Sequence, residues 1–68
     1  MKNIGEVIKR RRKLLGVSQK QFASIAGVGI NTLTKIERGE ANPSIETLSR
    51  VLDALGLSMV ITVKNAEI

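Results

Sequence analysis

Residues 18–39 constrain the fold of this chain more than any other stretch, because they read as two short helices separated by a very short turn. Ser18 begins the first helix, and Gln21 completes a capping box in which the two side chains bond free N–H groups of the first turn. Gly27 ends this helix, since glycine readily adopts the left-handed conformation that follows a last helical turn. A second helix is predicted over about 30–38 from regularly spaced apolar residues and a terminal glycine (Ile30, Leu33, Ile36 and Gly39). The pattern predicts a helix-turn-helix motif.

Further helices are predicted on both sides of this motif. Apolar residues recur at helical spacing over 3–15, and Gly16 follows them. In the helix that starts at Ser18, the apolar stripe is predicted to be Phe22, Ile25 and Ala26, with Ala23 beside it. Ser44 caps a last helix, whose apolar face is predicted to comprise Ile45, Leu48, Val51, Leu52 and Leu55. The predicted fold class is all-α.

Residues 57–63 differ from the rest, because they are rich in β-branched residues and partly alternate. They predict one strand, and no second strand is predicted to pair with its backbone. We therefore predict antiparallel pairing with the same strand of a second copy about a two-fold axis. The predicted dimer interface comprises Leu57, Met59, Val60, Ile61 and Val63. The alternative is that the segment covers the core of its own domain.

Length and composition narrow the class of protein. Sixty-eight residues form one domain, for which we predict a folded unit over 1–56, a dimerisation strand over 57–64 and a tail over 65–68. A chain this short buries little surface, so association with a second copy is a reasonable source of further burial. There is no Cys, no His and no glycine-rich phosphate loop. We therefore predict no metal, no cofactor and no enzymatic activity.

Charge is unevenly distributed along the chain. The formal net charge is +5, and residues 2–20 alone carry seven basic groups against one acidic group, Glu6. Such a cluster suits a polyanion, for which nucleic acid and an anionic membrane are the candidates, or it forms a solvated helix face. No apolar run is long enough to span a membrane, and no secretory signal is visible at the N-terminus, so we expect a cytoplasmic protein.

The motif residues resemble a known family. The matching positions are Ser18-Gln19, Ala23, Gly27-Val28, the run Ile36-Glu37-Arg38-Gly39 and Pro43. They resemble the Cro/cI-type (Xre-type) helix-turn-helix DNA-binding proteins over about residues 4–57. The resemblance implies a lambda-repressor-like bundle of four to five helices, here followed by the C-terminal strand. It also implies a dimer that binds a double-stranded DNA operator.

The resemblance also implies site residues. Base contacts are expected from the start and outer face of the recognition helix, at Gly29, Ile30, Asn31, Thr32 and Lys35. Phosphate contacts are expected at Arg38 and Asn42, and at Gln19, whose amide can instead contact a base edge. Phosphate contacts are also predicted at Ser18 and at Lys13, whose charge can alternatively serve only for steering or solubility. Arg12 and Glu37 match a partly buried ion pair that ties the first helix to the third.

Physical chemistry supports several of these assignments. Asn31 can pair bidentately with adenine, although it can also act as a capping residue, and Lys35 can donate to guanine. Ile30 can contact a thymine methyl group or turn into the core. Arg12 lies on the apolar side of its helix, and the negative charge of Glu37 opposes the dipole at a helix C-terminus. Both placements are explained if the two residues pair.

The C-terminal segment narrows the predicted function. Residues 55–62 resemble the end of HipB-type antitoxins, in which a terminal strand pairs across the dimer. This resemblance implies a repressor of its own toxin operon that also binds a HipA-type kinase toxin. Two alternatives stay open: a phage-type or restriction-modification controller regulator, and a protein-interaction module with the same fold.

Overall fold

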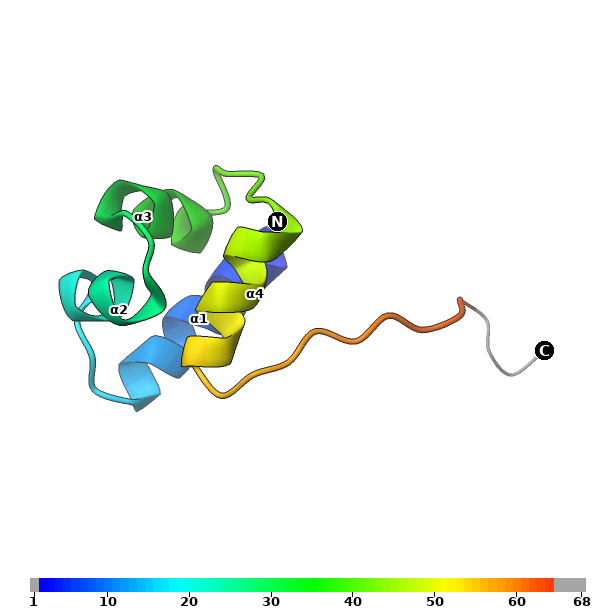
Figure 1. The fold of residues 1–68 in the computed structure, drawn as a ribbon, viewed down its shortest axis with the longest axis horizontal. Coiled ribbons are helices and arrows are strands. Elements are labelled where there is room, and N and C mark those ends of the chain that lie inside the picture. Colours follow the sequence, from blue (N-terminus) through cyan, green and yellow to red (C-terminus); the bar gives the residue numbers. More distant parts are fainter. Residues whose placement is uncertain (1, 65–68) are drawn as a thin grey trace.

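The computed structural model describes residues 2–64, which fold into a helical body followed by an extended segment (Figure 1). The helices are α1 (Lys2–Leu14), α2 (Gln19–Ala26), α3 (Ile30–Arg38) and α4 (Ile45–Ala54). Helix α3 packs against α1 and α2, and α4 packs against α2. The part of the chain thus described is all-α, as predicted, and the predicted tail over 65–68 lies outside it.

Every helix contributes to a single core. Its fully buried side chains are Ile8, Phe22, Leu33, Ile36, Val51 and Leu55, of which Phe22 is the one aromatic residue in the sequence. Because α3 supplies Leu33 and Ile36 from one side only, its other side is left for solvent. The core therefore holds α3 by its apolar face and presents its polar face outward.

The ends of α2 and α3 have the predicted chemistry. Both hydrogen bonds of the capping box between Ser18 and Gln21 are present, each at 3.1 Å. Gly27 has φ 73°, a left-handed backbone conformation that residues with a side chain rarely adopt. The Val28 N–H then donates to the Ala23 carbonyl at 3.0 Å. Three residues thus separate the two helices. Gly29 caps α3 with its backbone, without a side-chain hydrogen bond.

Gly5 has a structural role that the sequence pattern did not reveal. A Cβ atom built on it would lie 2.3 Å from the carbonyl oxygen of Ile36 and 3.0 Å from that of Glu37. Glycine therefore allows α1 to approach the backbone of the last turn of α3. Any larger residue would separate these helices.

Leu14, Ile25 and Ile45, which the sequence places at helical apolar spacing, are exposed instead, Leu14 to 74%. Ile25 is 67% exposed, because the buried face of α2 comprises Phe22, Ala23 and Ala26 and turns Ile25 outward. Ile45 is 71% exposed, because it opens α4 while the burial of that helix begins only at Leu48. Ile25 and Ile45 were assigned to apolar stripes from spacing alone, and both assignments are wrong.

The predicted C-terminal strand is not present among residues 2–64. Residues 57–63 run away from the helical body as a single extended segment (Figure 1). A strand is defined by hydrogen bonds to a neighbouring strand, and a single chain offers none here. Leu57 packs against the core, whereas Val60, Ile61 and Val63 are at least 75% exposed. The alternative reading, a cover over the chain's own core, therefore holds only for Leu57.

Candidate nucleic-acid interface

The outer face of α3 carries most of the residues predicted to contact bases. Gly29, Asn31, Thr32 and Lys35 are all exposed. Ile30 is 44% exposed, so it lies at the edge of this face rather than in the core. The structure thus brings the five residues together on one surface, at the N-terminal end and along the outer side of the helix.

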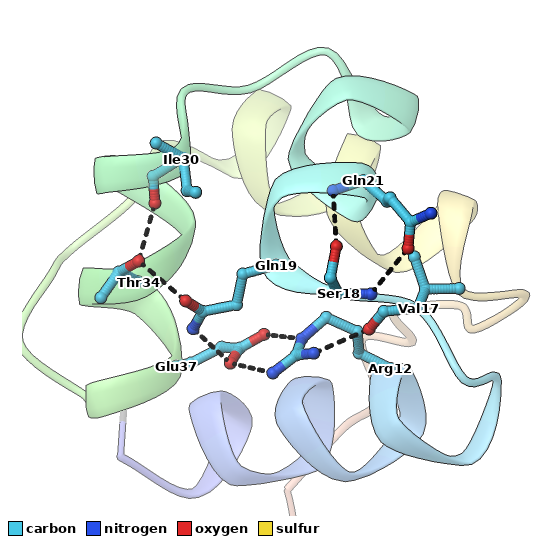
Figure 2. A network of polar contacts seen from close by, with 8 residues as sticks. All are labelled: Arg12, Val17, Ser18, Gln19, Gln21, Ile30, Thr34 and Glu37. Atoms are coloured by element: carbon cyan, nitrogen blue, oxygen red, sulfur yellow. Dashed lines mark hydrogen bonds and ion pairs between the residues drawn. The ribbon is translucent and has the colours of Figure 1, made fainter.

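A buried ion pair fixes the opposite side of α3. Arg12 Nε donates to Glu37 Oε2 at 2.7 Å, and Arg12 Nη2 donates to Glu37 Oε1 at 3.0 Å (Figure 2). Arg12 Nη1 also donates to the carbonyl of Val17 at 2.8 Å, in the segment that leads into α2. One guanidinium therefore joins α1, α3 and the α1–α2 loop. A bidentate arginine–carboxylate pair adds geometric specificity to its attraction.

The electrostatics of this pair favour its charged form. Burial by itself would raise the pKa of Glu37, but hydrogen bonds from Arg12 and Gln19 and the charges of Arg12 and Lys9 outweigh it and leave the pKa lowered. The hydrogen bond to Glu37 likewise raises the pKa of Arg12. The glutamate therefore stays ionised in the folded protein at neutral pH.

Gln19 extends this network to the middle of α3. Its Nε2 donates to Glu37 Oε1 at 3.0 Å, and its Oε1 accepts from Thr34 Oγ1 at 3.3 Å (Figure 2). Thr34 Oγ1 also lies 2.9 Å from the carbonyl oxygen of Ile30, one turn earlier. Gln19 was predicted to contact phosphate, but in this structure its amide connects α2 to α3. The sequence reading missed Thr34, whose polar side chain between the buried Leu33 and the exposed Lys35, three residues before Glu37, was the available signal.

The remaining predicted phosphate contacts are scattered. Lys13, Arg38 and Asn42 are exposed at the end of α1, the end of α3 and the following loop. Ser18 is exposed as well, but its hydroxyl already accepts the Gln21 N–H of the capping box.

Arg11 is a further residue whose contact the sequence reading did not foresee. Its Nε donates to the carbonyl of Leu55 at 3.0 Å, at the end of α4. Arg11 therefore anchors the point from which the C-terminal segment leaves the body.

Comparison with known proteins agrees with this geometry. The helix-turn-helix family matches residues 8–61. The chain is 42% identical over 66 residues to an uncharacterized HTH-type transcriptional regulator of Haemophilus influenzae, a match that covers 93% of this chain and 66% of that protein. It is 34% identical over 56 residues to the cryptic phage CTXphi transcriptional repressor RstR of Vibrio cholerae, covering 82% and 50% of the two chains. The chain thus spans half to about two thirds of these relatives.

Solved structures have the same fold. The biofilm master regulator SinR in complex with DNA is 43% identical, with a TM-score of 0.75, over 81% of this chain and 89% of that one. The restriction-modification controller protein C.AhdI from Aeromonas hydrophila is 25% identical, with a TM-score of 0.76, over 81% and 83%. The fold and the exposed face of α3 define an all-α helix-turn-helix protein. The chain belongs to the Cro/cI-type helix-turn-helix family.

Among the residues with described structure, no helix combines the length and the apolar character needed to cross a bilayer.

Proposed function

We propose that this protein is a sequence-specific DNA-binding transcriptional repressor that binds a palindromic operator as a dimer. One observation carries the proposal: the second helix of the motif is held by a buried apolar face while Asn31, Thr32 and Lys35 point to solvent. In helix-turn-helix proteins this helix enters the major groove. The DNA-bound relative SinR and the phage repressor RstR support the assignment.

Each exposed group on α3 has a chemical role in this proposal. Asn31 reads adenine through paired hydrogen bonds, and Lys35 donates to the O6 and N7 atoms of guanine. Thr32 and Ile30 offer methyl groups to thymine. Gly29 leaves the N-terminus of α3 without a side chain, so that a phosphate can approach its free N–H groups.

Phosphate contacts from Lys13, Arg38 and Asn42 set the position of the domain on the duplex. Ser18 and Gln19 are less suited to a phosphate than the sequence suggested, because both side chains are already bonded within the domain. For Gln19 we propose the role of a positioning residue, which can donate its second Nε2 hydrogen to a phosphate.

Dimerisation is proposed through the C-terminal segment. Met59, Val60, Ile61 and Val63 are exposed apolar side chains on an extended backbone. A neighbouring groove of about 310 Å³ is lined in part by Ile4, Val7 and Leu52. Pairing of two such segments would bury the apolar side chains and complete a β-ladder. The two recognition helices would then enter major grooves about 34 Å apart.

The narrower antitoxin role depends on the likeness of residues 55–62 to HipB-type proteins. The relatives described above are named as transcriptional regulators and a phage repressor, so they support the broader class. A HipA-type kinase toxin therefore stays a predicted partner, and co-purification with a HipA-type kinase would test it.

The proposed function is tested by selecting bound duplexes from a random pool and measuring affinity by fluorescence anisotropy. We expect a two-fold symmetric sequence with a Kd that weakens steeply as salt rises. Asn31→Ala should reduce the preference for the selected sequence by about 1–3 kcal/mol at one base pair of each half-site. Ser24→Ala, on the outer side of α2, is the matched control. If the protein binds no duplex at low ionic strength, the proposal is contradicted and a protein-interaction module is favoured.

A further inference from the structure

A second surface comprises six residues of α2 and the loop before it, none of which has a role in the proposed DNA contacts. A groove of about 550 Å³ lies there, lined by Gly16, Val17, Lys20, Gln21, Ser24 and Ile25. All of these residues come from the α1–α2 loop and from α2. We propose that this groove binds an acidic amphipathic helix of another protein.

The apolar character of the groove favours a protein ligand. Ile25 is 67% exposed, although a side chain of this kind is usually buried, and Leu15, next to the lining Gly16, is 48% exposed. One exposed apolar residue is ordinary, but apolar groups gathered around a groove are typical of an interaction site. An aliphatic side chain would be stabilised there by burial against Ile25 and Val17.

The charge around the groove specifies an acidic partner. Lys20 lines the groove and is exposed. The sequence has no Asp or Glu from residue 7 to residue 36, so no carboxylate of this stretch offsets its charge. Glutamates beside the apolar anchors of a ligand would therefore be attracted, whereas lysines would be repelled.

The dimensions favour a short helix. Helix α2 has 8 residues, which corresponds to a length of about 12 Å. A groove along it accommodates about two turns of a ligand helix whose apolar side chains recur at spacings of three and four. Gln21 forms a fixed wall of this groove, because its side chain accepts the Ser18 N–H at 3.1 Å.

The test uses a short synthetic helical peptide with leucines on one face and glutamates beside them, titrated into the full chain. Backbone amide shifts are followed by NMR, and affinity is measured by anisotropy of the labelled peptide. We expect shifts at Gly16, Val17 and Ile25. Ile25→Ser should weaken binding about tenfold, since it removes a buried aliphatic side chain. The equally exposed Ile45→Ser, on α4, is the matched control and should leave the affinity unchanged.

Charge and self-association are tested in the same system. Replacing the peptide glutamates with lysines should abolish binding. Lys20→Met should weaken the affinity for the acidic peptide about two- to threefold, and by less at high salt. Equal binding of both peptides, or shifts centred on Ile4, Val7 and Leu52, would overturn the proposal. So would a change in the sedimentation coefficient of Ile25→Ser, because the occupant would then be a second copy. Operator affinity, which Ile25→Ser should leave unchanged, reports separately on the proposed function.

Discussion

Arg12 and Glu37, which are 25 residues apart in the sequence, form two hydrogen bonds of 2.7 and 3.0 Å between α1 and the last turn of α3. The side chains are 8% and 2% exposed, so solvent screens the pair only weakly. The same carboxylate also accepts from Gln19 of α2. A single buried anion therefore holds three helices and sets the orientation of the face predicted to read bases.

Removal of this anion should destabilise the fold strongly. Glu37→Ala leaves the Arg12 guanidinium buried without its partner, and we expect a loss of about 3–5 kcal/mol in the free energy of unfolding. The control is Glu46→Ala, because Glu46 pairs with Arg50 at the same 2.7 Å but both side chains are exposed. That variant should lose less than about 1 kcal/mol. Thermal melts followed by circular dichroism compare them, and superimposable melts of wild type and Glu37→Ala would refute the role of the pair.

Stability should also depend on pH through Glu37. Its pKa is lowered in the folded protein, so the unfolded chain binds this proton more readily. The stabilisation is therefore fully present above the ordinary carboxyl pKa and is lost as pH falls through the lower pKa of the folded state. Denaturant unfolding measured from neutral to acid pH should show a steeper decrease in the free energy of unfolding for wild type than for Glu37→Gln. Parallel curves for the two proteins would show that Glu37 does not titrate in this way.

Gln19→Glu should act on the same anion from α2. The new carboxylate would lie where the Gln19 amide now donates to Glu37 at 3.0 Å, so a hydrogen bond is replaced by like-charge repulsion. We expect the free energy of unfolding to fall by about 1–3 kcal/mol at neutral pH. Part of this loss should be recovered on acidification. Gln21→Glu is the control, because a glutamate preserves the capping box. Equal unfolding free energies for the two variants would mean that the Gln19 bond contributes no stability.

Lys35 and Arg38 should differ in their effects on DNA binding. Lys35→Ala should change the ranking of operator variants, since Lys35 is predicted to contact base edges. Arg38→Ala should weaken all duplexes similarly and lower the slope of log affinity against log salt by about one unit. Anisotropy titrations over a salt series with a panel of operator variants distinguish these effects. An unchanged ranking for Lys35→Ala would remove it from the set of base-reading residues.

Truncation after Ser58 should separate folding from dimerisation. Leu57 is retained because it packs against the core, and the exposed apolar side chains beyond it are removed. We expect the melting curve at low concentration to be nearly unchanged, whereas sedimentation should show a monomer and operator affinity should fall. A truncated protein that still sediments as a dimer would exclude the C-terminal segment as the dimer interface.

The local features of this fold were predictable from short stretches of sequence. Ser18 and Gln21 form the capping box, Gly27 and Gly39 end their helices, and Leu33 and Ile36 face the core. These features depend on backbone preferences and hydrogen bonds within a few residues, so spacing alone reveals them. Family resemblance added the pairing of Arg12 with Glu37, which spacing alone only suggested.

Tertiary packing decided the rest. Ile25 and Ile45 match helical apolar spacing but are exposed, because neighbouring helices cover only part of each stripe. Gly5 is required only because the backbone of α3 passes beside it, and Gln19 bonds within the domain only because Glu37 lies 3.0 Å away. By itself the sequence determined the helices and their ends, since these depend on neighbours along the chain. Which faces remained free to bind DNA or protein was decided by contacts between residues distant in sequence.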